Sequence, residues 1–219
     1  KINSKLDIEL IFFKKNYFYW KAAKKIIRKK LKEFKLSPKW LIVCNNDIIF
    51  EDKYFFQKLL EIDNETFSVI GPKITNSKEE DLNPFMLNPL SKFKVSYWNL
   101  YFKSFYFSQL LNQIVHIKKF FSLSKNIKKL TQVYAVHGSL IIFSINFFSN
   151  GGFLDDNYKL YGEELTNAEI CKKLGIKIFY NPLLYVVHNE HASTKKANKK
   201  NLFFEAKKSH EYLIKKYLK

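Results

Sequence analysis

Cysteine is scarce in this chain, which has only Cys44 and Cys171 among its 219 residues. The two lie far apart and form no CxxC pair, so the sequence supports neither a disulfide framework nor a cysteine zinc site. Glycine and proline are also few, at 6 and 5 residues, which excludes a linker-rich or fibrous protein. We therefore expect a folded globular chain in a reducing, cytoplasmic setting.

Long hydrophobic runs are absent too. The most aromatic stretch, "YWNLYFKSFYFSQLLNQIVHI" at residues 97–117, is interrupted by Asn, Lys, Ser, Gln and His. It is too polar to cross a bilayer, which takes about 20 apolar residues, but it could lie in the membrane interface. The first residues, "KINSKLDIEL", have no apolar core behind their basic residues, so no signal peptide is expected.

Acidic residues are outnumbered, with 20 Asp and Glu against 38 Lys and Arg. The excess lies at the two ends, since residues 1–39 hold 13 basic and 3 acidic side chains, and residues 192–219 hold 9 and 2. Basic ends around a near-neutral body indicate a surface that meets a polyanion, whether phospholipid, nucleic acid or a diphosphate-linked substrate. The alternative is that the lysines only solvate surface helices. No recognised nucleic-acid motif is present, so a nucleic-acid partner is not expected.

Helical and strand periods alternate in the first third of the chain. Apolar residues recur at spacings of three and four over residues 20–34, which predicts an amphipathic basic helix that stops before Pro38. "WLIVC" at residues 40–44 is typical of a buried strand, residues 51–62 of a helix and residues 67–74 of a second strand. A strand, a helix and a strand at this spacing predict a parallel βαβ unit.

The rest of the chain continues the alternation. We expect a loop or insertion at residues 75–95, a buried strand at 133–143, a helix at 162–175, two short strands at 176–182 and 183–190, and a basic terminal helix at 201–218.

Polar residues follow the first strand directly, in the order Asn45, Asn46, Asp47. In open α/β sheets ligands collect where the carboxyl ends of strands meet loops. A carboxylate there can hold a hard cation such as Mg²⁺ together with phosphate oxygens and water, which makes Asp47 a candidate metal ligand. The alternative is a turn that caps the following helix, because Asn and Asp side chains bond well to nearby backbone groups.

A second polar group lies near the C-terminal end. Glu163 and Glu164 follow a glycine at a predicted helix start, and His188 and His191 follow the last strands. A carboxylate held near a site can act as a general base, whereas adjacent acids at a helix start can also simply complement its dipole. The spacing of the two histidines is not that of a zinc peptidase helix, and a histidine at a strand end is often only a packed residue.

The order of four segments resembles a known family. "WLIVCNNDIIFED", "VYAVHGSLIIFS", "GGFLDDNYKLYGEE" and "GIKIFYNPLLYVVHNEHAST" are similar to motifs of the family 2 glycosyltransferases of the GT-A fold, especially the rhamnosyltransferase-like members. The resemblance covers about residues 16–195. It implies an α/β fold with a GT-A-like, Rossmann-like and mainly parallel sheet flanked by helices. Residues 1–195 would form this domain without its N-terminal nucleotide-binding segment, and residues 196–219 a C-terminal basic helix.

The same resemblance implies an inverting transfer of a sugar from a nucleotide-diphosphate donor to a hydroxyl of a polysaccharide or lipid-linked acceptor. It implies a divalent metal, Mg²⁺ or Mn²⁺, and a cytoplasmic protein that can lie at the inner, anionic face of the membrane. The implied site residues are Glu164 as base with Glu163 beside it, Asn45, Asn46, Gly138 and Ser139 for substrate, and Asp47 and His188 for the metal.

Two other functions stay open from the sequence. A truncated or decayed glycosyltransferase-like chain could serve as a basic scaffold on a membrane surface through its amphipathic ends. A nucleic-acid-binding module would use the interleaved aromatic and lysine side chains of residues 97–107.

Overall fold

The computed structural model describes residues 7–33, 38–114, 127–189 and 198–218. His191 and the proposed boundary at residue 196 lie outside these residues. The elements are α1 Tyr19–Glu33, β1 Trp40–Cys44, β2 Ile48–Ile49, α2 Phe55–Leu60, β3 Val69–Asn76, α3 Lys92–Tyr101, α4 Phe105–Ile114, β4 Thr131–Val133, β5 Leu140–Ser144, α6 Ile145–Ser149, α7 Glu163–Lys173, β6 Ile178–His188 and α8 Lys199–Tyr217.

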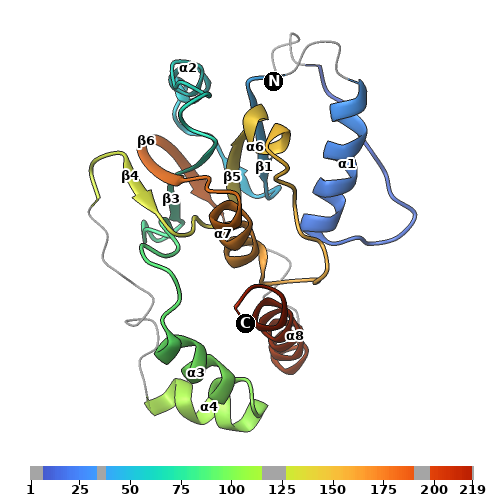
Figure 1. The fold of residues 1–219 in the computed structure, drawn as a ribbon, viewed down its shortest axis with the longest axis vertical. Helices are drawn as coiled ribbons and strands as arrows, with labels where there is room; N and C mark the ends of the chain where they lie inside the picture. The colour runs from blue at the N-terminus through green and yellow to red at the C-terminus, as the bar shows by residue number, and fades with distance from the viewer. Residues whose placement is uncertain (1–6, 34–37, 115–126, 190–197, 219) are drawn as a thin grey trace.

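The chain is a mixed α/β protein, with one sheet flanked by helices (Figure 1). The strand order is β1-β5-β3-β6-β2, and β4 also pairs with β6. Strands β1, β3 and β5 therefore share a sheet, as their apolar sequences predict.

The expectation of a mainly parallel sheet is wrong. Among the described strands only β3 and β6 pair in parallel, while β5 is antiparallel to both of its neighbours, β1 and β3. Strands β1 and β3 do run in the same direction, but β5 lies between them. A continuous apolar run indicates a strand that is buried on both faces, and it says nothing about direction. Strand β5 is such a run, since all five of its residues are buried.

Two strand boundaries also differ from the prediction. The single strand expected at residues 133–143 is two strands, β4 and β5, joined by residues 134–139. The two short strands expected after residue 176 are one strand, β6, whose register against β3 shifts between Asn181 and Tyr185. The three residues between these two form a bulge that contains Pro182, so the proline does not interrupt the ladder.

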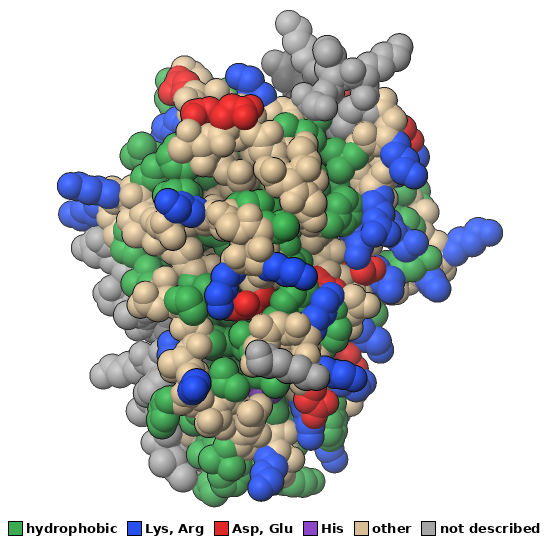
Figure 2. Space-filling model, in the orientation of Figure 1, with side chains coloured by type: hydrophobic (Ala, Val, Ile, Leu, Met, Phe, Trp, Pro, Cys, Tyr) green, Lys and Arg blue, Asp and Glu red, His purple; other side chains and the backbone are tan. Residues whose placement is uncertain are grey.

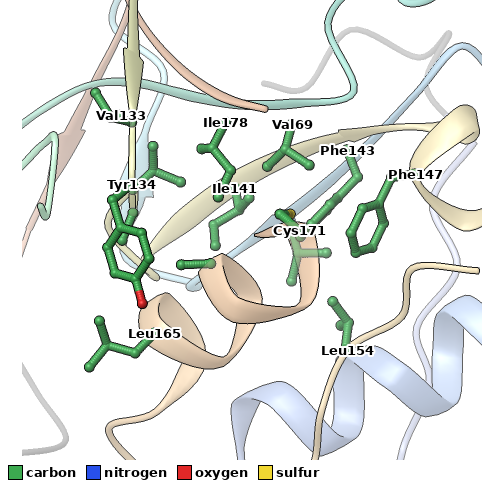
Figure 3. Close-up of a cluster of buried hydrophobic side chains, with 14 of the residues drawn as sticks. Val69, Val133, Tyr134, Ile141, Phe143, Phe147, Leu154, Leu165, Cys171 and Ile178 are labelled. Carbon is green, nitrogen blue, oxygen red and sulfur yellow. The ribbon is translucent and has the colours of Figure 1, made fainter. Parts of the chain in front are cut away.

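The sheet has an apolar cluster on each face, because successive side chains of a strand point to opposite sides. Val69 belongs to the cluster that α1 and α7 cover, and its neighbour Ile70 to the one that α2 covers. Figure 3 shows the first cluster, to which α7 contributes Leu165 and Cys171 and the sheet contributes Val69, Ile141 and Ile178. Helix α1 contributes Trp20 and Ile27, which confirms its predicted amphipathic character.

Helices α3, α4 and α8 gather at the end of the molecule away from α2 (Figure 1). They meet through aromatic contacts, including Phe102 with Phe203 at 5.6 Å between ring centroids. Lys and Arg side chains are numerous on the side of the molecule that α1 occupies (Figure 2). Within the described part of the chain, every helix is too short or too polar to pass through a bilayer.

Candidate active site

One edge of the sheet collects most of the residues singled out in the sequence. Strands β1, β3 and β6 share a direction, so their carboxyl ends lie at this edge. Asp47 follows β1 and His188 ends β6. Because β5 runs the opposite way, the residues that precede it, Gly138 and Ser139, reach the same edge. Ligands of open α/β sheets bind at such an edge.

The Asn45–Asp47 segment is a turn between β1 and β2, and not the cap of a helix. The backbone N–H of Asn45 donates to the carbonyl of Ser139 at 2.8 Å, and the carbonyl of Asp47 accepts from Asn189 N–H at 2.9 Å. These bonds fix the turn between the loop before β5 and the end of β6. Asn46 is exposed on the turn.

Asp47 and His188 are in direct contact. The Asp47 Oδ1 lies 3.1 Å from His188 Nε2, and Asn45 Nδ2 lies 3.5 Å from the same nitrogen. His188 is buried, whereas a third of the Asp47 side chain is exposed. A half-buried carboxylate therefore lies beside a buried imidazole that is 141 positions away in the sequence.

The side chains of Asp47 and His188 offer ligand atoms that fit the divalent metal that the resemblance implies. Carboxylate oxygen suits Mg²⁺ and Mn²⁺, and imidazole nitrogen is a further ligand for transition metals. Among the described residues, no group of three or more His, Cys, Asp or Glu side chains is arranged to hold a metal ion. Phosphate oxygens and water would complete the coordination, as is usual for Mg²⁺ at phosphate sites.

His137 lies in the loop before β5 and was not singled out by its sequence. Its Nδ1 accepts the backbone N–H of Ser139 at 3.2 Å and lies 2.8 Å from Ser139 Oγ. Because a backbone N–H can only donate, Nδ1 is the unprotonated nitrogen and Nε2 carries the hydrogen. Burial, together with nearby His188, lowers the pKa of His137 to about 4, so the ring is a neutral donor at physiological pH.

Glu163 and Glu164 form the first turn of α7, as predicted. Glu164 Oε1 accepts the backbone N–H of Gly138 at 3.1 Å, and Glu163 Oε2 accepts that of Gly162 at 2.9 Å. Burial and the neighbouring Glu163 carboxylate raise the pKa of Glu164 to about 8, although the hydrogen bond from Gly138 acts in the opposite direction. Glu164 therefore has the basicity of a group poised for proton transfer near neutral pH.

Tyr19, at the start of α1, also reaches this loop. Its hydroxyl donates to the carbonyl of Gly138 at 3.0 Å. Burial, with Cys44 and the two glutamates nearby, raises the pKa of Tyr19 well above its usual range, so the hydroxyl stays protonated. The helical period of α1 predicted only that this segment packs on the core.

The loop of residues 137–139 thus connects the turn that carries Asp47 with the start of α7, which carries Glu164. Its Ser139 carbonyl holds the turn that carries Asp47, and its Gly138 N–H holds Glu164. A pocket of about 670 Å³ opens beside the loop, and both His137 and Glu164 line it.

Gly138→Ala should disturb this arrangement without unfolding the protein. A Cβ at this position would lie 2.3 Å from Glu163 Cγ and 2.8 Å from Glu164 Oε1, so both side chains must move. We expect the free energy of unfolding to fall by about 1–2 kcal/mol, as in other overpacked sites. Urea denaturation measures this. An unchanged stability would show that the glutamates relax at no cost.

No protein-family model matches the chain, and no curated protein matches it.

Proposed function

We propose that this protein is an inverting glycosyltransferase of GT-A-like architecture that uses a nucleotide-diphosphate sugar as donor and a hydroxyl group as acceptor. One observation carries the proposal: the loop of residues 137–139 bonds on one side to Asn45, in the turn where Asp47 contacts His188, and on the other side to Glu164, a carboxyl of raised pKa. Sugar transfer needs both groups around one anomeric carbon. The order of the sequence motifs supports the same reaction class.

The donor side of the site is the turn after β1. Asp47 and His188 would hold the metal, and a bound Mg²⁺ or Mn²⁺ supplies positive charge that stabilises the departing diphosphate. Asn45 lies beside them, with Nδ2 3.5 Å from His188 Nε2, and would hydrogen-bond the nucleotide or its ribose. Gly138 and Ser139 lie next to this group and would border the transferred sugar.

The acceptor side is the start of α7. Glu164 takes the proton of the acceptor hydroxyl, and the oxygen forms a bond to the anomeric carbon. The bond from that carbon to the diphosphate oxygen breaks on the opposite face, and the diphosphate leaves with the electron pair. A single displacement of this kind inverts the configuration at the anomeric carbon. The pKa of about 8 suits a base at mildly alkaline pH.

Asp47→Asn should weaken donor binding that depends on the metal. The amide keeps the shape of the side chain but removes its negative charge, so we expect roughly tenfold weaker binding. Titration calorimetry with UDP-glucose, UDP-galactose and dTDP-rhamnose, each with and without Mn²⁺, measures the effect.

The matched control is Asp7→Asn, which removes the same charge from an exposed position. It should bind donor like the unaltered protein. If Asp47→Asn also binds donor normally in the presence of Mn²⁺, Asp47 is not a ligand.

A further inference from the structure

The pocket beside Glu164 is much larger than a hydroxyl group needs. Its volume is about 670 Å³, which is within the usual range for a ligand of drug size. It lies among α7, α8 and the hairpin of α3 and α4, so it extends from the sheet edge toward the end of the molecule where these helices gather (Figure 1). The aromatic residues of its lining include Trp98, Tyr101, Phe102 and Phe203.

Several polar groups in the lining are already hydrogen-bonded within the protein. His210 Nε2 lies 2.8 Å from Asn99 Oδ1, and Ser209 Oγ donates to the carbonyl of Leu160 at 2.6 Å. Asn112 Nδ2 donates to the Tyr101 hydroxyl at 3.2 Å. Burial lowers the pKa of His210 to about 4, so its ring is neutral. Gln109 and Lys199 are further polar side chains of the lining, but most of the remaining lining residues are apolar or aromatic. Away from Glu164 and His137, the pocket therefore offers a ligand mainly apolar surface.

We propose that this pocket binds the hydrocarbon chain of a glycolipid-like acceptor, with the hydroxyl-bearing head group at Glu164. The inference rests on the proposed function for the role of the head group. A carbohydrate chain in this position would bury many hydroxyls against aromatic walls, and each hydroxyl left without a partner costs free energy. A hydrocarbon chain loses no hydrogen bonds there and removes apolar surface from water.

The surface around the pocket indicates that the chain comes from a lipid membrane. The α3–α4 hairpin carries apolar side chains that are largely exposed, among them Phe93, Tyr106 and Leu110. Lys92, Lys94 and Lys103 lie on the same hairpin. Exposed aromatic and aliphatic groups interspersed with lysines suit the interface of an anionic bilayer.

A chain-length series tests the pocket without any transfer reaction. Binding of glucose, hexyl β-glucoside, octyl β-glucoside and decyl β-glucoside is measured by titration calorimetry, below the concentrations at which they form micelles and without nucleotide. We expect affinity to rise roughly tenfold for each two methylene groups added. Equal affinity along the series overturns the proposal.

A pocket-filling variant locates the binding. Ala206 lines the pocket on α8, so Ala206→Trp should reduce the affinity for decyl β-glucoside at least tenfold. Lys208→Trp adds the same side chain to an exposed position of the same helix and should bind like the unaltered protein. If Ala206→Trp binds as tightly as Lys208→Trp, the chain lies elsewhere and the proposal fails. The chain-length series uses only the unaltered protein, so it tests the proposal even if Ala206→Trp does not fold.

The two proposals can fail separately. Chain-length-dependent binding that Ala206→Trp abolishes, in a protein that transfers no sugar, supports the pocket and contradicts the transferase. Transfer to glucose and to decyl β-glucoside with the same KM supports the transferase and overturns the pocket.

Discussion

Glu164→Gln should reduce the rate of glycosyl transfer by about 10²- to 10⁴-fold, which is the usual contribution of a general base. The amide has the shape of the carboxyl group and can still accept the N–H of Gly138, but it cannot take a proton. We therefore expect donor binding to stay unchanged while kcat falls. Release of nucleoside diphosphate from the donor panel, with decyl β-glucoside as acceptor, measures the rate. Normal turnover by this variant would rule out Glu164 as the base.

The pH dependence gives a second readout for Glu164. A base must be unprotonated, so activity should rise with pH through about 8. Stability should change in the opposite sense, because the pKa of Glu164 in the folded protein lies above the ordinary value of 4.5. Its contribution to stability is complete below about pH 4.5 and is lost as pH rises through about 8. Glu164→Gln should remove this loss, which urea denaturation across the pH range detects.

Glu163→Gln is the matched variant for the pair. It removes the neighbouring charge that helps to raise the pKa of Glu164, so the pH profile of transfer should move to lower pH with activity retained. A loss of activity as large as that of Glu164→Gln would instead mean that Glu163 takes part in the proton transfer.

Asp155→Asn should lower the free energy of unfolding by about 3 kcal/mol, because it removes a buried charge that several donors share. Its Oδ2 accepts hydrogen bonds from Tyr212 at 2.7 Å, Lys216 at 2.8 Å and Tyr217 at 2.6 Å. All three donors belong to α8, so this single carboxylate fastens the end of α8 to the body of the protein. Urea denaturation measures the change.

The free energy of unfolding at low pH should also depend on Asp155. Burial alone would raise the pKa of Asp155, but hydrogen bonds from Lys216, Tyr217 and Tyr212 outweigh burial and lower it to about 2. Its contribution is therefore present above about pH 4 and is lost as pH falls toward 2. Asp155→Asn should remove this loss of stability between about pH 4 and pH 2.

The control on the same helix is Glu211→Gln, which removes an exposed carboxylate 3.8 Å from Lys207. Exposed pairs of this kind contribute about 0–1 kcal/mol, so the expected change is small. If both variants lose the same stability, the Asp155 cluster is no stronger than a surface ion pair.

Periodicity in the sequence predicts some elements closely here, but it did not predict α3, α4 and α6, and it predicts the arrangement of the elements less well. Helix α1 and strand β1 lie within one residue of their predicted bounds, because an amphipathic stripe and an apolar run are local patterns. The direction of β5 depends on which strands it pairs with, and these are distant in the sequence. The apolar residues of 133–143 also concealed a loop, since Tyr134, Ala135 and Val136 are buried without being in a strand.

The candidate site shows the same limit. Asp47, Glu164 and His188 attract notice in the sequence because each is polar next to an apolar element. His137 and Tyr19 were not singled out, because His137 lies inside a run that predicts a single strand and Tyr19 belongs to a helix whose pattern indicates only packing. Their roles come from contacts with Ser139 and Gly138, and in the case of Tyr19 the partner is 119 positions away. For His137 the sequence did contain a signal: a polar histidine followed by a glycine inside an apolar run indicates a local break in the strand.

The position of β5 also bears on how the chain folds during synthesis. Strand β5 pairs with both β1 and β3, yet it is translated long after either of them. Until β5 emerges from the ribosome, β1 lacks the strand that it pairs with, and β3 gains its second partner, β6, later still. Sheet completion is therefore a late, non-local event, and such events are slow. Unpaired apolar strands are prone to aggregate, so we expect the nascent chain to need a chaperone most before residues 140–188, which hold β5 and β6, have been made.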